Sequence, residues 1–219
     1  IAAESGTAAG SIAHGFTTGD TVVTHGLTSS RYAVLLFPRS GISSYIFVYH
    51  PDASTNLALN TNWSSTASNR IINVTSTTFS IAEPGSVYYA GPAGVYDYLV
   101  LDDNKSSVSV GKFIGNNSPL GPYIHTGHRP RMIIIKSMTT ARDWVVFDTA
   151  RDPDNVADSR IDFSTAGAEF AAALDVDILA DGFKPRSTDI DGNASGVSYA
   201  YISIGDLAGG GDLPPIYGR

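Results

Sequence analysis

Two groups of side chains in this sequence are of the types that hold metal ions or move protons: the histidines and a cluster of acids. The histidines are His14, His25, His50, His125 and His128. His125 and His128 are three residues apart, and on a strand or turn this spacing does not direct two imidazoles at one ion. We interpret the histidines as structural hydrogen-bonding groups and expect no metal ion among them.

The acids gather in "DVDILADG" (Asp175–Gly182) and "DIDGN" (Asp189–Asn193). The second stretch begins like a calcium loop, but Ala194 stands where the sharp turn needs glycine, and no glutamate stands at position twelve. Asx-turns explain these residues without an ion. Calcium binding stays open here, as does a glycosidase, which would need two carboxylates across a cleft.

Other catalytic signatures are missing from the sequence. There is no nucleophile elbow, phosphate-binding loop, dinucleotide fingerprint or H-E-x-x-H motif. Cysteine is absent, which excludes disulfides, thiolate nucleophiles and zinc–thiolate sites. We therefore expect a protein that is not an enzyme and that has no cofactor.

Aromatic side chains in polar loops are the candidate ligand-binding residues. Trp63 lies in "NTNWSSTASN", and Tyr88 and Tyr89 lie in "EPGSVYYAGPAG". Such an aromatic can stack on a sugar ring or anchor a partner. The alternative is that each one packs onto its own domain, because large exposed apolar groups are the exception.

Composition limits the classes of partner. The chain has 219 residues and a net charge of −7, with no dense run of lysine and arginine, so we expect no nucleic-acid partner. No apolar stretch approaches the roughly 18 residues that span a bilayer, so we expect no membrane segment. The chain begins with Ile1, and we expect it to be processed or part of something longer.

The elements that position these residues occur twice along the chain. Val34–Leu36 matches Ile133–Ile135 at an offset of 99 residues, and the same diagonal matches Tyr45–Val48 with Trp144–Phe147. Tyr96 and Tyr98 recur as Tyr199 and Tyr201 at an offset of 103. Val22–Gly26 matches Tyr123–Gly127, which puts His25 and His125 in nearly equivalent places. Residues that both copies share serve the fold, so we interpret the matched tyrosines as packing residues.

Short β-rich runs bounded by Gly, Pro, Asn, Asp and Ser predict an all-β chain of two tandem related antiparallel β-sandwich domains, jelly-roll-like in type. We place the domains at residues 1–104 and 105–206, with Val108, Val110 and Phe113 in the strand that opens the second. The continuous apolar runs Tyr32–Phe37 and Met132–Ile135 predict strands covered on both faces. Ser164–Leu174 is a candidate helix of about two turns.

Function is expected in parts of the chain that the copies do not share. These are the loops Asn60–Asn69, Glu83–Gly94 and Arg151–Arg160, and the Gly/Pro-rich arm at residues 207–219. The arm cannot hold regular structure for long, and it would have to pack on something, such as a neighbouring subunit. Its candidate assembly residues are Gly209, Pro214, Pro215 and Tyr217.

The second copy contains a series of recognisable motifs. "DTARDPDN" (Asp148–Asn155), "ADGF" (Ala180–Phe183) and "NASGVSYAY" (Asn193–Tyr201) follow a strand that contains Trp144. In these motifs the chain resembles a repeat β-domain family of tailed-bacteriophage virion proteins, both tail-fibre-like and structural. "FIGNN" (Phe113–Asn117) stands for the family's opening turn, and His128 replaces its usual aromatic. The first copy is similar to diverged members and lacks the Asn-Ala-Ser-Gly element.

The resemblance implies a non-enzymatic virion structural protein on the exterior of the phage particle, either a tail fibre or spike module or a head decoration. Its partners would be other virion proteins, copies of itself, as a trimer in our expectation, and a host surface glycan. Two alternatives are a capsid cement or decoration protein without a receptor role, and a secreted carbohydrate-binding module.

Overall fold

The structure is a computed structural model that describes residues 7–14, 19–27, 29–39, 46–59, 70–82 and 94–205. All regular elements in these residues are β-strands, and every strand pair is antiparallel. The all-β prediction is confirmed at this level. In the described part of the chain there is no helix of the length and hydropathy needed to cross a membrane.

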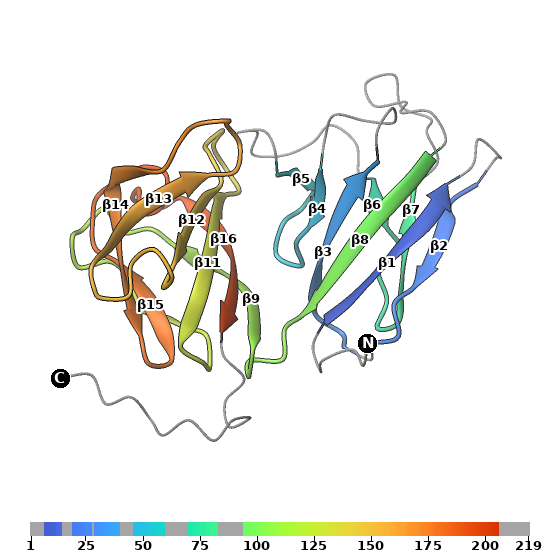
Figure 1. Cartoon of the computed structure of the whole chain (residues 1–219), viewed down its shortest axis with the longest axis horizontal. Coiled ribbons are helices and arrows are strands. Elements are labelled where there is room, and N and C mark those ends of the chain that lie inside the picture. Colours follow the sequence, from blue (N-terminus) through green and yellow to red (C-terminus); the bar gives the residue numbers. More distant parts are fainter. Residues whose placement is uncertain are drawn as a thin grey trace.

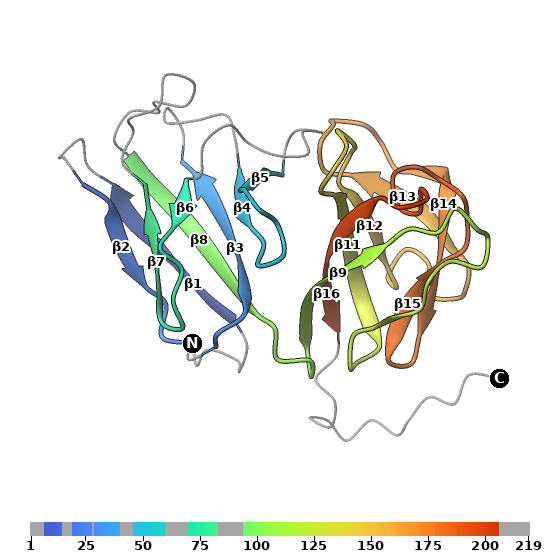
Figure 2. The same cartoon turned by 180° about the vertical axis from the view of Figure 1, so that it is seen from behind.

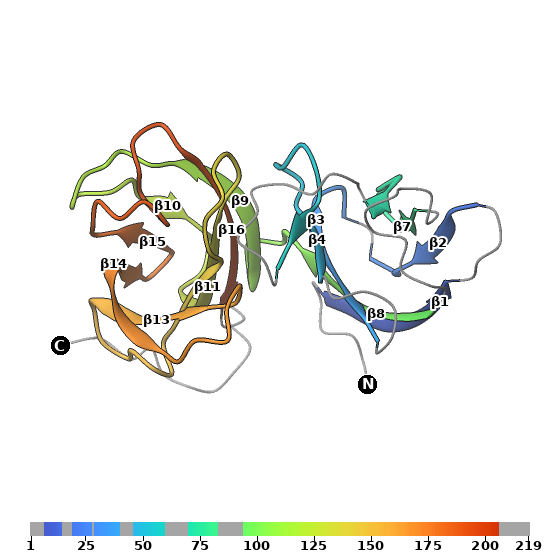
Figure 3. The ribbon, with the colours of Figure 1, turned by 90° about the horizontal axis from the view of Figure 1, so that it is seen from above.

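The first half contains two sheets that enclose one apolar core (Figures 1 and 3). The larger sheet has the order β1 (Thr7–His14), β8 (Gly94–Asp102), β3 (Tyr32–Pro38), β4 (Phe47–Tyr49) and β5 (Leu57–Ala58). The smaller has the order β2 (Thr21–Thr24), β7 (Thr78–Ile81) and β6 (Ile71–Ile72). Val34, Leu36 and Phe47 from the larger sheet meet Phe79 and Ile81 from the smaller.

The second half is one eight-stranded sheet that curls almost into a closed barrel, as Figure 3 shows. Its order is β10 (Ile124–His125), β15 (Gly182–Pro185), β14 (Phe170–Leu179), β13 (Ala157–Asp162), β12 (Val145–Asp148), β11 (Pro130–Ser137), β16 (Ser198–Gly205) and β9 (Val108–Ile114). The strand expected around Val108, Val110 and Phe113 is β9. The expected boundary at Asn104 falls between β8 and β9.

The two halves repeat one strand order. β1-β8-β3-β4-β5 corresponds to β9-β16-β11-β12-β13, and β2-β7-β6 corresponds to β10-β15-β14. The registers agree with the sequence offsets, because Leu35 pairs with Leu99 and Ile134 pairs with Ile202. The predicted internal repeat is therefore present in the topology. The halves differ at one place, which we call the seam. In the second half β13 pairs with β14 there, whereas in the first half the corresponding strands β5 and β6 belong to separate sheets.

The sequence alignment of β4 with β12 is wrong by one residue. Leu35 pairs with Val48, and its equivalent Ile134 pairs with Val146, so the offset here is 98 and not 99. Side chains alternate between the two faces of a strand, so a one-residue slip would put Val48 and its match on opposite faces. In the structure Val48 and Val146 point to the same apolar cluster.

The match of Val22–Gly26 with Tyr123–Gly127 agrees with the strand registers, and it places His25 and His125 one position apart. Val23 pairs with Phe79 and Ile124 pairs with Phe183, so His25 corresponds to Thr126. His25 is buried at 6% exposure, whereas the side chain of His125 is 63% exposed. Both turns that follow contain a glycine with positive φ, Gly26 at 74° and Gly127 at 82°.

The candidate helix at Ser164–Leu174 is wrong as well. No helix forms there, and the strand β14 begins at Phe170 and runs to Leu179. Arg160 pairs with Phe170 and Ser159 pairs with Ala171, so the alanine-rich segment is held as a strand by β13. Helix propensity is a weak preference that such pairing overrides.

The two halves pack against each other through a shared apolar cluster, and we call this contact the joint. Figure 2 shows β3, β4 and β5 of the first half on the side that faces β9 and β16 of the second. The same face of each half contributes: Leu35 and Ile134, Val48 and Val146, Ile46 and Trp144, Leu99 and Ile202 are equivalent pairs within it. Trp144 Nε1 donates across this joint to the Ala58 carbonyl at 2.8 Å. The prediction that Tyr32–Phe37 and Met132–Ile135 are covered on both faces is confirmed, because one face lines its own core and the other lines the joint.

Candidate functional site

The motif residues of the second half make backbone contacts that hold the fold. Asn193 is fully buried, and its Nδ2 donates to the carbonyls of Ser118 and Ser187, each at 2.8 Å. Its Oδ1 accepts from the Asn116 backbone N–H at 3.0 Å. One amide thus ties the Asn-Ala-Ser-Gly segment to the opening turn, and its role is structural.

A second asparagine makes the same kind of contact in both halves. Asn155 donates to the Ile178 carbonyl at 3.0 Å and accepts from the Ile178 N–H at 2.8 Å. In the first half Asn56 donates to the Ile71 carbonyl at 3.1 Å and accepts from the Ile71 N–H at 2.6 Å. Each asparagine uses its amide like a short strand partner, although the registers make Val176, and not Ile178, the equivalent of Ile71.

The matched tyrosines pack, as the repeat predicted. Tyr96 and Tyr199 are fully buried in the cores of their halves. Tyr201 lies over Gly111 on the neighbouring strand, where an added Cβ would be 2.7 Å from the tyrosine oxygen. Tyr98 covers Gly10 in the same way. The closing strand of each half is therefore part of the scaffold.

The acidic cluster is organised by an arginine. Arg160 is 3% exposed and donates to Asp162 at 2.5 Å and to Asp191 at 2.6 Å. Asp189 Oδ1 accepts from the Asp191 N–H at 2.8 Å, which is the expected Asx-turn. Among the described residues no three His, Asp or Glu side chains are grouped to hold a metal ion.

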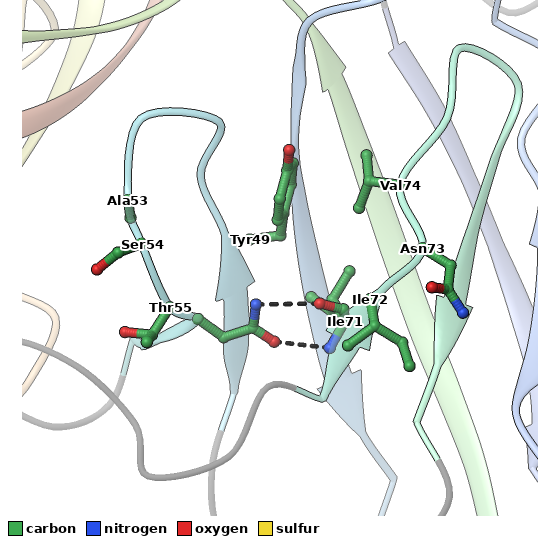
Figure 4. Close-up of a pocket in the computed structure, with 9 residues that line it drawn as sticks. Tyr49, Ala53, Ser54, Thr55, Ile71, Ile72, Asn73 and Val74 are labelled. Carbon is green, nitrogen blue, oxygen red and sulfur yellow. Dashed lines mark hydrogen bonds between the residues drawn. The ribbon is translucent and has the colours of Figure 1, made fainter.

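A pocket of about 270 Å³ opens in the first half between the β4–β5 loop and β6 (Figure 4). Ala53, Ser54 and Thr55 form one wall, Ile72, Asn73 and Val74 form the other, and the Tyr49 ring stands between the two. The Asn56–Ile71 hydrogen bonds cross its floor, as the dashed lines show. The pocket occupies the seam where β5 and β6 do not pair.

The β4–β5 loop that forms one wall of this pocket is held in place by contacts in the joint between the halves. His50 Nε2 donates to the Tyr201 carbonyl at 3.2 Å, and His50 Nδ1 accepts from the Asp52 N–H at 3.2 Å. Burial lowers the pKa of His50 to about 4, so this ring is neutral near pH 7 and has one donor and one acceptor. Arg31 forms an ion pair with Asp52 and donates to the Val110 carbonyl at 3.1 Å.

The chemistry of the pocket suits a small uncharged group that carries hydroxyls. The described residues that line it include no carboxylate and no cationic side chain, and they combine one phenol, two hydroxyls and two amides with aliphatic groups. Burial raises the pKa of Tyr49, so its hydroxyl stays protonated. The volume is at the small end of ligand sites and fits a single ring better than an extended chain.

The second half has no counterpart to this arrangement in its described residues. β13 pairs with β14 at the equivalent seam, and fully buried Phe147 takes the place of Tyr49. The pocket is thus specific to the first half. Sequence reasoning missed it, although the match of Asn56 with Asn155, together with the different lengths that follow them, marks this seam as the place where the copies diverge.

The residues proposed from sequence for ligand binding and assembly lie outside the described residues. These are Trp63, Tyr88, Tyr89, Gly209, Pro214, Pro215 and Tyr217. Trp63 belongs to the segment that joins β5 to β6, the two strands beside the pocket. These assignments stay predictions.

The family profile of a domain of unknown function, DUF7483, matches residues 3–206. The chain belongs to the DUF7483 family. The match covers both halves, so the DUF7483 unit is the duplicated pair and not one half. No curated protein and no solved structure matches the chain.

Proposed function

We propose that this DUF7483 chain is a non-enzymatic structural protein on the exterior of a tailed-bacteriophage particle, where it contacts host surface glycans. The proposal includes the finer fold expected from sequence, two tandem related β-sandwich domains of jelly-roll-like type. Other virion proteins and further copies of the chain, as a trimer, are the partners that the resemblance implies.

The observation that carries the proposal is what the motif residues do. Asn193, Asn155 and Gly182 belong to the motifs shared with the virion repeat family, and each is held by close backbone contacts. Residues that make contacts needed by the backbone of a domain are characteristic of that type of domain. The resemblance thus rests on scaffold residues, and this supports the assignment to a virion module.

The surface hollow at the β5–β6 seam supports the glycan part of the proposal. It is neutral, carries hydroxyls and amides, and is walled by a loop that the other half holds in place. A preformed site loses less conformational entropy when it binds a ligand. The same feature favours the alternative of a secreted carbohydrate-binding module, whereas a cement protein without receptor role would make no use of it.

Quantitative mass spectrometry of purified particles tests the virion role. We expect the chain to be present at a fixed stoichiometry. A copy number that matches capsid geometry indicates a decoration protein, and a few copies indicate a tail fibre or spike. Particles that are infectious and contain none of the chain would overturn the virion role.

Binding to a glycan array tests the pocket. Thr55→Tyr places a ring in the pocket mouth, and we expect it to reduce glycan binding at least about tenfold. Asp154→Tyr is the matched control, because Asp154 directly precedes Asn155 as Thr55 precedes Asn56, and the second half has no such pocket. Trp63→Ala and Tyr88→Ala test the loop aromatics in the same assay. Binding that is unchanged in Thr55→Tyr removes the pocket from the proposal.

A further inference from the structure

An aromatic side chain is held rigidly on the surface of the second half. Tyr123 directly precedes β10 and is 50% exposed. Its hydroxyl donates to Asp181 Oδ1 at 2.6 Å. The ring edge lies against Gly182 on the neighbouring strand, where an added Cβ would be 3.1 Å from Tyr123 Cε2. The ring therefore has a fixed orientation although half of its surface is open to solvent.

Two polar groups stand at the edge of this ring. Ile124 points into the core at 5% exposure, so Tyr123 and His125 lie together on the outer face. The two rings are 6.5 Å apart between centroids, and His125 Nε2 is 3.9 Å from Asp181 Oδ2. The His125 and Asp181 side chains are 63% and 59% exposed, so both have capacity left for a ligand.

The shared fold does not require this set of residues. The strand registers make Val22, Thr24 and Thr77 the first-half equivalents of Tyr123, His125 and Asp181. The first half forms the same strand pair without the aromatic, the imidazole or the carboxylate. Packing over Gly182 accounts for a ring at position 123, but it does not account for the exposed acid and imidazole beside it.

We propose that Tyr123, Asp181 and His125 form a carbohydrate site in the second half, which takes one pyranose ring against the exposed part of the Tyr123 ring. The C–H groups of a sugar face carry a slight positive charge and pack on the negative face of an aromatic ring. Asp181 accepts hydrogen bonds from the sugar hydroxyls, and His125 donates or accepts at the rim. Tyr123 supplies the one phenol ring of the site and is half-exposed, so the site does not surround an ammonium group as an aromatic cage does.

Fixing the ring beforehand helps such a shallow site. A mobile exposed tyrosine would lose side-chain entropy when it bound a ligand, and the bond to Asp181 has already removed that freedom. A single stacked sugar with two or three hydrogen bonds gives an affinity of about 1 mM, and several sites on one assembly would add avidity. The inference rests on the proposed glycan contact only for the biological source of the sugar.

The test uses the full chain and a panel of neutral, acidic and amino monosaccharides, with binding measured by saturation-transfer NMR and titration. We expect Tyr123→Ala to reduce binding about tenfold or more, and Asp181→Asn and His125→Gln to reduce it severalfold. Tyr123→Phe keeps the stacking face but loses the bond to Asp181, so a smaller loss is expected. Val22→Ala, at the equivalent exposed position of the first half, should leave binding unchanged.

Tyr123→Ala uncovers Gly182 and can lower stability, so its melting temperature is measured alongside. If that variant does not fold, Asp181→Asn and His125→Gln decide, because neither side chain covers Gly182. The proposal is overturned if no saccharide of the panel binds, if binding is the same in all these variants, or if only amines bind and salt abolishes the binding. A negative result in these saccharide measurements does not change the outcome of the particle stoichiometry measurement, so the failure of one proposal can be distinguished from the failure of the other.

Discussion

At the scale of single residues, two glycine–tyrosine pairs explain why certain positions cannot change alone. Gly10 and Gly111 each lie beneath a tyrosine of a neighbouring strand, Tyr98 and Tyr201. In each pair the ring occupies the volume that a Cβ would take. Glycine normally weakens a strand, and here the covering ring replaces the missing side-chain contacts.

Gly111→Ala tests this arrangement. The new methyl group would lie 2.8 Å from the Tyr201 ring, so the ring must move, and it would also strain the Tyr201 hydroxyl's 3.2 Å contact with Ser109. We expect a loss of about 1–3 kcal/mol in the free energy of unfolding, measured by urea denaturation. In a Tyr201→Ala background the same change should be neutral or stabilising, since alanine suits a strand interior better than glycine. An equal loss in both backgrounds would contradict the steric explanation.

Part of this could be predicted from the sequence. The recurrence of Tyr98 as Tyr201 identified both as packing residues, but their partners Gly10 and Gly111 lie on other strands, and cross-strand contacts do not follow from linear spacing. The one-residue error that matched Tyr45–Val48 with Trp144–Phe147 has a similar origin. Two short strands can be aligned in neighbouring registers, and only the pairing of Leu35 with Val48 and of Ile134 with Val146 decides between them.

At the scale of elements, two asparagine clamps distinguish the seam between β5 and β6 from the seam between β13 and β14. By clamp we mean the paired hydrogen bonds of Asn56 with Ile71 and of Asn155 with Ile178. Asn56 is 3% exposed and bonds both backbone groups of Ile71, whereas Asn155 is exposed and β13 also pairs with β14. A buried polar group that loses its partner keeps its desolvation cost, while an exposed one turns to water.

Asn56→Ala should therefore cost more stability than Asn155→Ala. We expect a loss of about 2 kcal/mol or more for the first and about 1 kcal/mol for the second, from chemical denaturation. Hydrogen exchange should show faster exchange of the Ile71 amide in Asn56→Ala. Equal losses from the two substitutions would mean that burial does not set the strength of the clamp.

The sequence predicted the order and type of most elements, and it failed where local preference and pairing conflict. The alanines of Ser164–Leu174 favour a helix, yet Phe170 and Ala171 pair with β13. The pocket was missed because it arises from the absence of a strand pair in one copy. The different chain lengths after Asn56 and Asn155 mark the place, but they do not show that a strand pair is missing there.

At the scale of the whole molecule, the halves behave like a dimer joined in one chain. Equivalent faces meet in the joint, as in an isologous interface. Either half on its own would expose that apolar face to water. The continuous apolar runs predicted coverage on both faces, but they did not say that the second cover is the other copy. The joint also holds the pocket wall through His50 and Tyr201, so stability of the joint and shape of the pocket are coupled.

Acid should weaken this joint through His50. The folded-state pKa is about 4 and the unfolded value is about 6.5, so between these values the unfolded chain binds more protons. Stability is then fully present above pH 6.5 and falls as the pH drops toward 4, by about 3 kcal/mol from this group. Burial also lowers the pKa values of His25 and His128, which act in the same direction. Calorimetric melting temperatures between pH 4 and 8 should show the decline.

His50→Asn isolates the contribution of that residue. Asp148, its equivalent in the second half, accepts from the backbone N–H of Ala150 at 3.0 Å, so an asparagine can cap the corresponding turn without titrating. The variant should show a shallower decline of melting temperature with acid, even if it is less stable at pH 8. His125→Asn removes an exposed histidine and should keep the full decline. If the melting temperature of His50→Asn falls with acid as steeply as that of the wild type, His50 does not cause the decline, and protonation of His25 and His128 does.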